Sequence, residues 1–282
     1  MRKQLSLRAR RTLIWKRIKY NWSVTKICEH FRITRRSFYY HWNNYQKYGW
    51  EGLSIKSRRP HTIHRTPQHI VDKVIQIRKE HNYGPNKIEA ELKRQGIKIS
   101  HNTIHRILVK HGLNNPIDKP RRKWGKKRFE REHSNSLWQA DFKLTEDDKW
   151  MITFLDDHSR FVVGCKINLD ATGENAIKLL EKAIAKFGNP KQLLTDQGTQ
   201  FVNPRGGVTK FTQFCLDNGI RHIVASKRRP TTIGKVERWH RTYEEEHCKY
   251  KTLRWFVYYY NYKRINQAIN YLTPAEVYFR DM

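Results

Sequence analysis

The chain has 282 residues, of which 38% are hydrophobic and 12% aromatic, which is enough apolar material for folded domains. Its 57 lysine and arginine residues against 26 aspartate and glutamate residues leave a net charge of +31, which indicates a polyanionic partner, with nucleic acid as the first candidate. No apolar run of about 18 residues and no apolar signal core are present, so the sequence predicts a cytoplasmic, nucleoid-associated protein of a prokaryotic cell with no membrane partner.

The positive charge is concentrated in the first half. Residues 1–135 hold 34 lysine and arginine against 9 aspartate and glutamate residues, a net charge of +25, whereas residues 136–282 hold 23 against 17, a net charge of +6. We therefore expect the first half to supply most phosphate contacts. Carboxylates in the second half would repel DNA unless metal ions neutralise them.

Residues 1–50 are predicted to form a helix-turn-helix unit. Val24, Ile27, Cys28 and Phe31 fall on one helical stripe, and Thr34 is a candidate N-cap of the helix that follows. The start of that second helix carries side chains suited to phosphates and base edges, namely Arg35, Arg36, Ser37 and Tyr39. The alternative is a basic helix in an ordinary bundle, but the net charge favours DNA binding.

Residues 66–113 repeat the pattern and predict a second helix-turn-helix unit. Thr66 with Pro67 is expected to begin one helix, Pro85 the next, and Ser100 a third. The outward positions of the third helix are predicted DNA contacts, namely His101, Asn102, Thr103 and Arg106.

Two basic segments separate these units from each other and from the second half. Residues 51–65, with Arg58 and Arg59, fit either a plain linker or an arm lying in a minor groove. Residues 114–135 contain prolines and little apolar periodicity, which is typical of a linker. Their basic cluster of Arg121, Arg122 and Lys123 is predicted to contact DNA.

From residue 136 the hydrophobic period becomes that of β-strands. Three strands are expected within 136–169, followed by a helix that Thr172 caps and Gly188 ends. A strand LLTD, a helix FTQFCLDNG, a strand IRHIVAS and a helix from Gly234 complete the order. This order predicts an α/β domain with the mixed five-stranded sheet of the ribonuclease H-like fold.

The motifs in this region resemble a known family. LWQADF, TFLDDHSR, LLTDQGTQF and TTIGKVERWHRTYEEE, closed by YNYKRINQAINYLTPAEVY, resemble the integrase-type catalytic core of DDE insertion-sequence transposases. The two helix-turn-helix units are similar to that family's end-binding region, so the resemblance covers almost the whole chain. It implies a catalytic core at 136–250 and a C-terminal helical segment at 251–282.

The resemblance implies the catalytic acids. The Asp of the first strand, the Asp of the TDxG turn and the Glu of GKxER fall on Asp141, Asp196 and Glu237. The 40 residues between the last two are more than is usual in the family, and VNPRGGVTK looks like a surface insertion that a loop tolerates. Three converging carboxylates would bind Mg²⁺ or Mn²⁺, with two ions expected.

The implied activity is that of a transposase. It would bind the terminal inverted repeats of its element as a homo-oligomer on double-stranded DNA, cut them, and join them to target DNA. ATP is not expected, because the GK of IGKVER lacks the earlier glycine of a phosphate loop. The alternative is a catalytically silent, transposase-derived DNA-binding regulator. A tyrosine recombinase site in RWHRTY is disfavoured, since Arg238 and Tyr243 fall on different helix faces.

Charged residues beside the acids allow two interpretations. Asp156 and Asp157 are expected to form a turn and to pair with Arg160 rather than to bind metal. Lys235 flanks Glu237 and is predicted to contact DNA, and a solvated charge run is the alternative.

Overall fold

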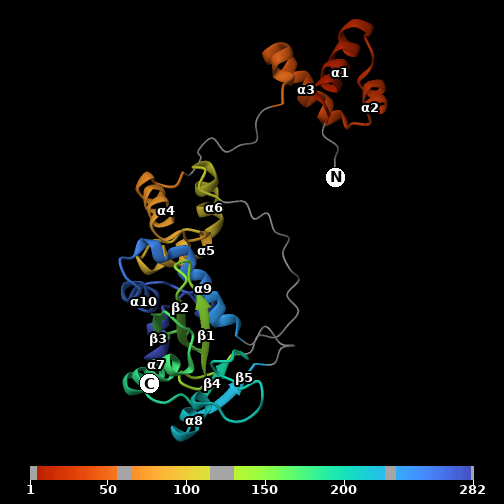
Figure 1. The fold of residues 1–282 in the computed structure, drawn as a ribbon. Coiled ribbons are helices and arrows are strands. Elements are labelled where there is room, and N and C mark those ends of the chain that lie inside the picture. The colour runs from red at the N-terminus through yellow and green to blue at the C-terminus, as the bar shows by residue number, and fades with distance from the viewer. Residues whose placement is uncertain (1–4, 56–64, 115–129, 226–232, 281–282) are drawn as a thin grey trace. The chain divides into compact units, whose positions relative to one another are not determined.

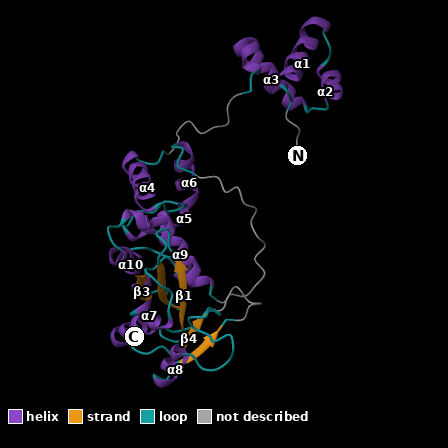
Figure 2. Cartoon of the chain, viewed as in Figure 1, coloured by secondary structure: helices purple, strands orange, loops and turns teal. Residues whose placement is uncertain are grey.

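The computed structural model describes residues 5–55, 65–114, 130–225 and 233–280, which belong to two compact units, residues 1–66 and residues 67–282. Figure 1 labels the elements, and Figure 2 separates helices from strands. Within the described ranges, no helix has the length and apolar content to cross a membrane. The predicted DNA contacts at Arg58, Arg59, Arg121, Arg122 and Lys123 lie outside the described residues.

The first unit is a small helical domain. Its elements are α1 (Leu7–Tyr20), α2 (Val24–Phe31), α3 (Arg35–Tyr48) and the 3-10 helix η1 (Gly49–Leu53). The side chain of Thr34 accepts a hydrogen bond from the Ser37 backbone N–H, so Thr34 caps α3 as predicted. The sequence did not indicate α1, because arginines interrupt its apolar stripe. One of them, Arg10, is buried and donates to the Leu53 carbonyl at 3.2 Å.

The second unit begins with three more helices. They are α4 (Gln68–His81), α5 (Pro85–Arg94) and α6 (His101–Lys110). Ser100 caps α6 as predicted, but the prediction that Thr66 caps the first of these helices is wrong. Pro67 occupies the N-cap position and no side chain caps the helix, so α4 begins one residue later than the Thr-Pro pair implied.

The rest of the second unit is built on one mixed sheet. Its strands are β1 (Trp138–Leu144), β2 (Trp150–Asp156), β3 (Val162–Asn168), β4 (Gln192–Thr195) and β5 (Arg221–Val224). They lie in the order β3-β2-β1-β4-β5, with β1, β2 and β3 antiparallel and with β1, β4 and β5 parallel. The predicted five-stranded ribonuclease H-like sheet is confirmed.

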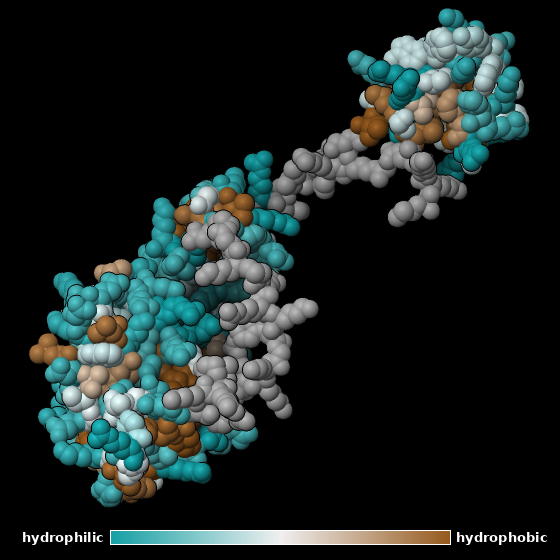
Figure 3. Space-filling view, turned by 45° about the vertical axis from the view of Figure 1, so that its right-hand side comes forward, coloured by the Kyte–Doolittle hydropathy of each residue, from teal (hydrophilic) through white to brown (hydrophobic). Residues whose placement is uncertain are grey.

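Helices cover both faces of this sheet. One apolar core lies against α7 (Gly173–Phe187), α8 (Lys210–Asp217) and α11 (Pro274–Tyr278). A second core lies against α9 (Gly234–Glu246) and α10 (Leu253–Tyr262). Thr172 caps α7, and Thr273 with Glu276 forms the expected capping box of α11. The surface is mainly hydrophilic in the view of Figure 3, and hydrophobic residues appear there as separate small patches.

The segment between α10 and α11 differs from a continuous terminal helix. Helix α10 ends at Tyr262, and the chain then forms a short antiparallel bridge between Asn266 and Leu272 around the 3-10 helix η3 (Gln267–Ile269). A further 3-10 helix, η2 (His247–Lys249), follows α9. Residues 263–272 therefore do not form the single stripe of side chains that a continuous helix would have.

Candidate active site

Strand β1 points Asp141 toward helix α9. Side chains alternate between the two faces of a strand. Trp138, Ala140 and Phe142 belong to the core under α7 and α8, so Gln139 and Asp141 face the opposite side. On that side the backbone N–H of Val236, in the first turn of α9, donates to Gln139 Oε1 at 3.4 Å.

Asp196 reaches the same place from the neighbouring strand. Strands β1 and β4 pair in parallel with Trp138 opposite Leu193 and Gln139 opposite Leu194. Two residues further along, this register sets Asp141 beside Asp196. Leu194 packs into the core under α9, so the alternation directs Asp196, just past the strand end, to the same face. The Asp196 carboxylate accepts a hydrogen bond of 3.0 Å from the Gly198 backbone N–H.

The charge of Asp141 acts on the Asp196 carboxylate. Partial burial raises the pKa of Asp196, and the negative charge of Asp141 raises it further, whereas the Gly198 hydrogen bond acts in the opposite direction. Two carboxylates therefore share one edge of the sheet in a position where a bound cation would relieve their repulsion.

Helix α9 runs beside β1 and carries Glu237. His240 Nδ1 lies 3.5 Å from Asp141 Oδ2, and one turn later Glu244 Oε1 lies 2.5 Å from Lys143 Nζ. Glu237 stands three and seven residues before His240 and Glu244, so it occupies the same helical stripe. Its side chain is exposed. The structure thus sets Glu237 on the face of the sheet that carries both aspartates. Among the described residues, no group of three or more His, Cys, Asp or Glu side chains is already arranged to hold a metal ion.

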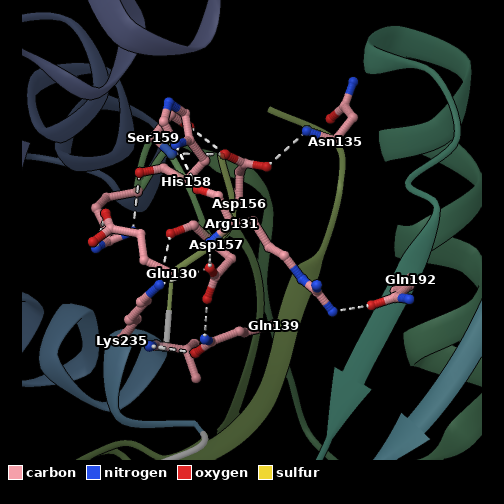
Figure 4. A network of polar contacts seen from close by, with 12 residues as sticks. Glu130, Arg131, Asn135, Gln139, Asp156, Asp157, His158, Ser159, Gln192 and Lys235 are labelled. Carbon is pink, nitrogen blue, oxygen red and sulfur yellow. Dashed lines mark hydrogen bonds and ion pairs between the residues drawn. The ribbon is translucent and has the colours of Figure 1, made fainter. Parts of the chain in front are cut away.

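A buried polar network fixes the start of α9 (Figure 4). Asp157, directly after β2, is fully buried, and its Oδ2 lies 2.7 Å from Lys235 Nζ. Its carboxylate also accepts hydrogen bonds from Gln139 Nε2 at 2.7 Å and from the Arg131 backbone N–H at 2.9 Å. Because Lys235 and Val236 are both held, the first turn of α9, with Glu237, is fixed against β1 and β2.

This network gives Lys235 a structural role. Its side chain is only 17% exposed and its ammonium group also donates to the Asp157 carbonyl at 3.0 Å. Burial lowers the pKa of Lys235, the nearby Arg160 adds to that effect, and Asp157 opposes it. This environment does not fit the predicted DNA contact, because the ammonium group is already engaged inside the protein.

Asp156 forms a turn, as its position suggested. Its carboxylate accepts hydrogen bonds from the Ser159 backbone N–H and hydroxyl at 2.8 and 2.6 Å and from the Asn135 N–H at 2.9 Å. Burial raises the pKa of Asp156, against the effect of these hydrogen bonds. The expected pairing of Arg160 with the two aspartates is wrong, since its guanidinium group contacts Glu130, in the segment before β1, at 2.8 Å.

The predicted DNA contacts of α3 lie mostly at the surface. Arg35 and Arg36 are exposed, Tyr39 is 49% exposed and Ser37 is half-buried. Arg35 Nη2 donates to Thr25 Oγ1 at 3.2 Å, which connects α3 to α2. Their contact with DNA stays a prediction.

The predicted contacts of α6 are likewise accessible. Asn102 and Arg106 are exposed and Thr103 is half-buried. His101 Nδ1 lies 3.2 Å from Glu89 Oε2, so the ring is oriented by α5. These contacts, too, stay predictions.

Sequence reasoning missed three residues of the site. Gln139 and Asp157 connect the sheet to α9, and His240 contacts Asp141. The position of His240, three residues after Glu237, was a usable signal, because that spacing returns to the same helix face. A buried partner for Asp157 could not be chosen from the sequence.

Three protein families match segments of the chain. The Integrase core domain family matches residues 131–230. The Helix-turn-helix domain family matches residues 11–61, and the Homeodomain-like domain family matches residues 37–108.

Several known proteins are similar to the chain. "Putative integrase ORF3" of Spiroplasma virus SpV1-C74 is 30% identical over 155 residues, which are 47% of this chain and 42% of that protein. An uncharacterised protein of insertion element IS407 from Burkholderia multivorans is 24% identical, over 69% of this chain and 74% of its own length. The transposase for insertion sequence element IS629 of Shigella sonnei is 22% identical, over 92% and 93% respectively. The match thus spans less than half of the viral relative.

Among solved structures, the HTLV-2 integrase catalytic core domain in complex with magnesium aligns with 52% of this chain and 98% of that chain. Its TM-score is 0.42 and its sequence identity is 19%.

Proposed function

Since residues 131–230 match the Integrase core domain family and helix-turn-helix families match the residues ahead of them, we propose that the chain is a transposase. It binds the terminal inverted repeats of its element and hydrolyses one phosphodiester bond at each end. The freed 3′ hydroxyl then attacks a phosphodiester bond of the target DNA, which forms a new phosphodiester bond and releases a 3′ hydroxyl of the target strand. Holding two ends and a target at once requires a homo-oligomer on DNA. The observation that carries the proposal is the alignment of Asp141 with Asp196 on the sheet face covered by α9.

The residues at this edge fit a divalent metal site. Asp141, Asp196 and Glu237 offer only carboxylate oxygens, which are the ligands that Mg²⁺ and Mn²⁺ prefer. Burial raises the pKa of Asp196 and the negative charge of Asp141 raises it further, so a bound cation would favour the charged form of this carboxylate. When bound, a pair of such ions supplies activation of the attacking oxygen and stabilisation of the leaving oxygen.

The chain's own residues would hold these acids in place. The Gly198 N–H fixes one oxygen of Asp196, and His240 lies against Asp141. Behind Asp196, the Thr195 hydroxyl donates to the Asp196 carbonyl and lies 2.9 Å from His222 Nε2, which ties β4 to β5. The exposed position of Glu237 leaves its carboxylate free to turn toward the aspartates.

The decisive experiment replaces Asp196 by Asn in the full chain. Duplexes tiled across the DNA that flanks the gene serve as substrates, with Mg²⁺ and a denaturing gel as the readout. Losing one ligand removes several kcal/mol of transition-state stabilisation. We therefore expect cleavage to fall roughly 10³-fold, at 1.36 kcal/mol per tenfold, with binding in a mobility-shift assay unchanged.

Asp170→Asn is the matched control, because Asp170 is exposed and lies outside the site. This variant should cleave DNA like the parent. Full cleavage by Asp196→Asn would contradict the assignment of the acid. A parent protein that binds the duplexes but never cuts them would support the silent regulator instead. A covalent protein–DNA adduct on the gel would point to a tyrosine nucleophile.

A further inference from the structure

We propose that helices α4–α6 are docked on the catalytic core of the same chain. In each protomer, the DNA that α6 contacts is then cut by the active site of that same protomer, an arrangement in cis. The inference rests on the proposed function for its DNA substrate. The docking itself rests on contacts that involve no DNA.

The apolar part of the joint is centred on one fully buried side chain that completes the core of the helical unit. Ile265, just after α10, is fully buried, and it belongs to one cluster with Val74 of α4, Ile88 of α5 and Ile104 of α6. Tyr271 from the same segment packs against this cluster. The three helices therefore close around a residue that the catalytic part of the chain supplies.

Polar contacts surround this apolar joint. The ring of Tyr259 in α10 stacks on His81 with centroids 6.0 Å apart and planes 10° apart, and its hydroxyl lies 3.1 Å from His81 Nδ1. The Tyr83 hydroxyl lies 3.4 Å from the same oxygen. At the edges, Lys249 Nζ donates to the Glu80 carbonyl at 2.9 Å, and Arg94 contacts Glu276 at 2.6 Å.

The joint connects directly to the helix that carries Glu237. Arg264, the neighbour of Ile265, makes a two-pronged ion pair with Glu246 at the end of α9, with hydrogen bonds of 2.8 and 3.0 Å. Both side chains are nearly buried, at 12% and 8% exposed. Because α9 is fixed at this end by Arg264 and at its start by Lys235, a shift of the helical unit would disturb the helix beside Asp141.

The consequence is a fixed distance between the DNA-reading face of α6 and the acids. A helix-turn-helix unit on a free tether could serve the active site of any protomer. A docked unit instead presents DNA to the active site of its own chain. The bond that is cut is then the phosphodiester bond at a set distance from the bases that α6 contacts.

The docking is tested by a spin-label distance measurement on the full chain. The exposed residues Lys110 on α6 and Glu181 on α7 are replaced by Cys, and Cys28 and Cys248 by Ser. We expect one narrow distance distribution, which broadens in Ile265→Asp. Ile55→Asp, the same change at an exposed isoleucine, should leave it narrow. A broad distribution in the parent, or a narrow one in Ile265→Asp, would overturn the proposal.

A milder variant separates undocking from unfolding. Tyr259→Phe with Arg94→Glu removes polar contacts of the joint but keeps Ile265 in place. We expect the distance distribution to broaden while the helical circular dichroism stays at the parent value. An unchanged distribution in this variant would also count against the docking.

The cis arrangement is tested by mixing two inactive proteins. Asp196→Asn lacks an acid, and Asn102→Ala with Arg106→Glu lacks the α6 contacts. Since neither chain carries both functions, we expect the mixture to show the same loss of cleavage as each protein alone. Restored cleavage, or full cleavage by the α6 variant alone, would overturn cis reading. If the parent itself never cuts DNA, the proposed function fails, and the distance measurement still decides the docking.

Discussion

The two helical units of this chain have similar sequence patterns, but they differ in whether their own residues complete their hydrophobic core. Among the residues that the structure describes, the core of the first unit, which includes Ile14, Ile27 and Phe38, comes from residues 5–53. The core of the second unit includes Ile265, which lies far along the chain beyond the sheet. A short helix-turn-helix pattern therefore does not reveal whether its unit stands alone or is part of a larger body.

The same contrast applies to the cations. In the first unit Arg35 and Arg36 are exposed on α3, where phosphate groups can reach them. In the second unit Lys87 of α5 lies near Arg264 and Glu246, and burial lowers its pKa to about 8. Lys235 is likewise engaged with Asp157. Part of the positive charge that suggested DNA binding is thus held inside the protein. Lys235 pairs there with Asp157, whereas burial of the Lys87 ammonium group is a cost to the folded state.

The largest expected effect is seen when the two helical units are produced as separate fragments. Residues 1–66 should unfold cooperatively in urea, because their core is complete. Residues 67–113 should show no cooperative transition, since removing a fully buried isoleucine contact costs about 2–5 kcal/mol and a domain of this size has little stability to lose. Circular dichroism during urea titration measures both. A cooperative transition in the 67–113 fragment would show that its core does not need Ile265.

The next largest effect is expected for Lys235→Met in the full chain. Leaving Asp157 buried without its partner should lower the free energy of unfolding by about 3–5 kcal/mol. Lys182→Met, at an exposed position of α7, is the matched control and should change it little. Urea unfolding gives the values. If Lys235→Met weakened DNA binding at unchanged stability, the predicted DNA contact of Lys235 would be correct after all.

A pH-dependent effect is expected for Lys87→Met. The ammonium group of Lys87 is disfavoured by burial in the folded state, so the folded chain releases this proton near pH 8 and the unfolded chain only near 10.5. Below pH 8, Lys87 is protonated in both the folded and the unfolded chain. The full free-energy cost of burying its ammonium group then lowers the stability of the folded state. Between these values the unfolded state binds more protons, so stability rises with pH.

The comparison between Lys87→Met and the parent isolates this contribution. The variant should be more stable at pH 7, by up to about 3 kcal/mol at 1.36 kcal/mol per pH unit of pKa shift, and the difference should shrink above pH 8. The tyrosines in the joint titrate in both proteins and cancel from the difference. Lys93→Met, at an exposed position on the same helix, should give a difference near zero at every pH. If the difference in the free energy of unfolding between Lys87→Met and the parent did not change with pH, the proposed burial effect on Lys87 would be contradicted.

The regular elements could be predicted from the sequence because local periodicity determines them. Alternating apolar residues gave β1, β2 and β3, and the capping residues Thr34, Ser100 and Thr172 gave the starts of three helices. Strand alternation and the parallel pairing of β1 with β4 then suffice to put Asp141 and Asp196 on one face. These are properties of neighbouring residues and of sheet geometry.

The remaining features depend on contacts between distant segments, which a single sequence does not contain. Lys235 looked like one more cation for DNA, and only the folded chain brings it to Asp157. Ile265 lies within the segment 251–282 that was expected to be helical, whereas α10 ends at Tyr262 and Ile265 packs into the core of the α4–α6 unit. The sequence did not predict helix α1, because its arginines interrupt the apolar pattern around Leu13 and Ile14, which are fully buried.

The smallest expected effect concerns the exposed cations of the first unit and distinguishes a recognition helix from a merely basic bundle. Arg36→Ala should reduce the slope of log affinity against log salt by about 1 for DNA binding by residues 1–66, since one phosphate contact is lost. Arg8→Ala removes an arginine of α1 that is also exposed and should leave the slope unchanged. Fluorescence anisotropy over a salt series measures both slopes. Equal reductions for the two variants would mean that the unit binds through its total charge, and the recognition role of α3 would have to be abandoned.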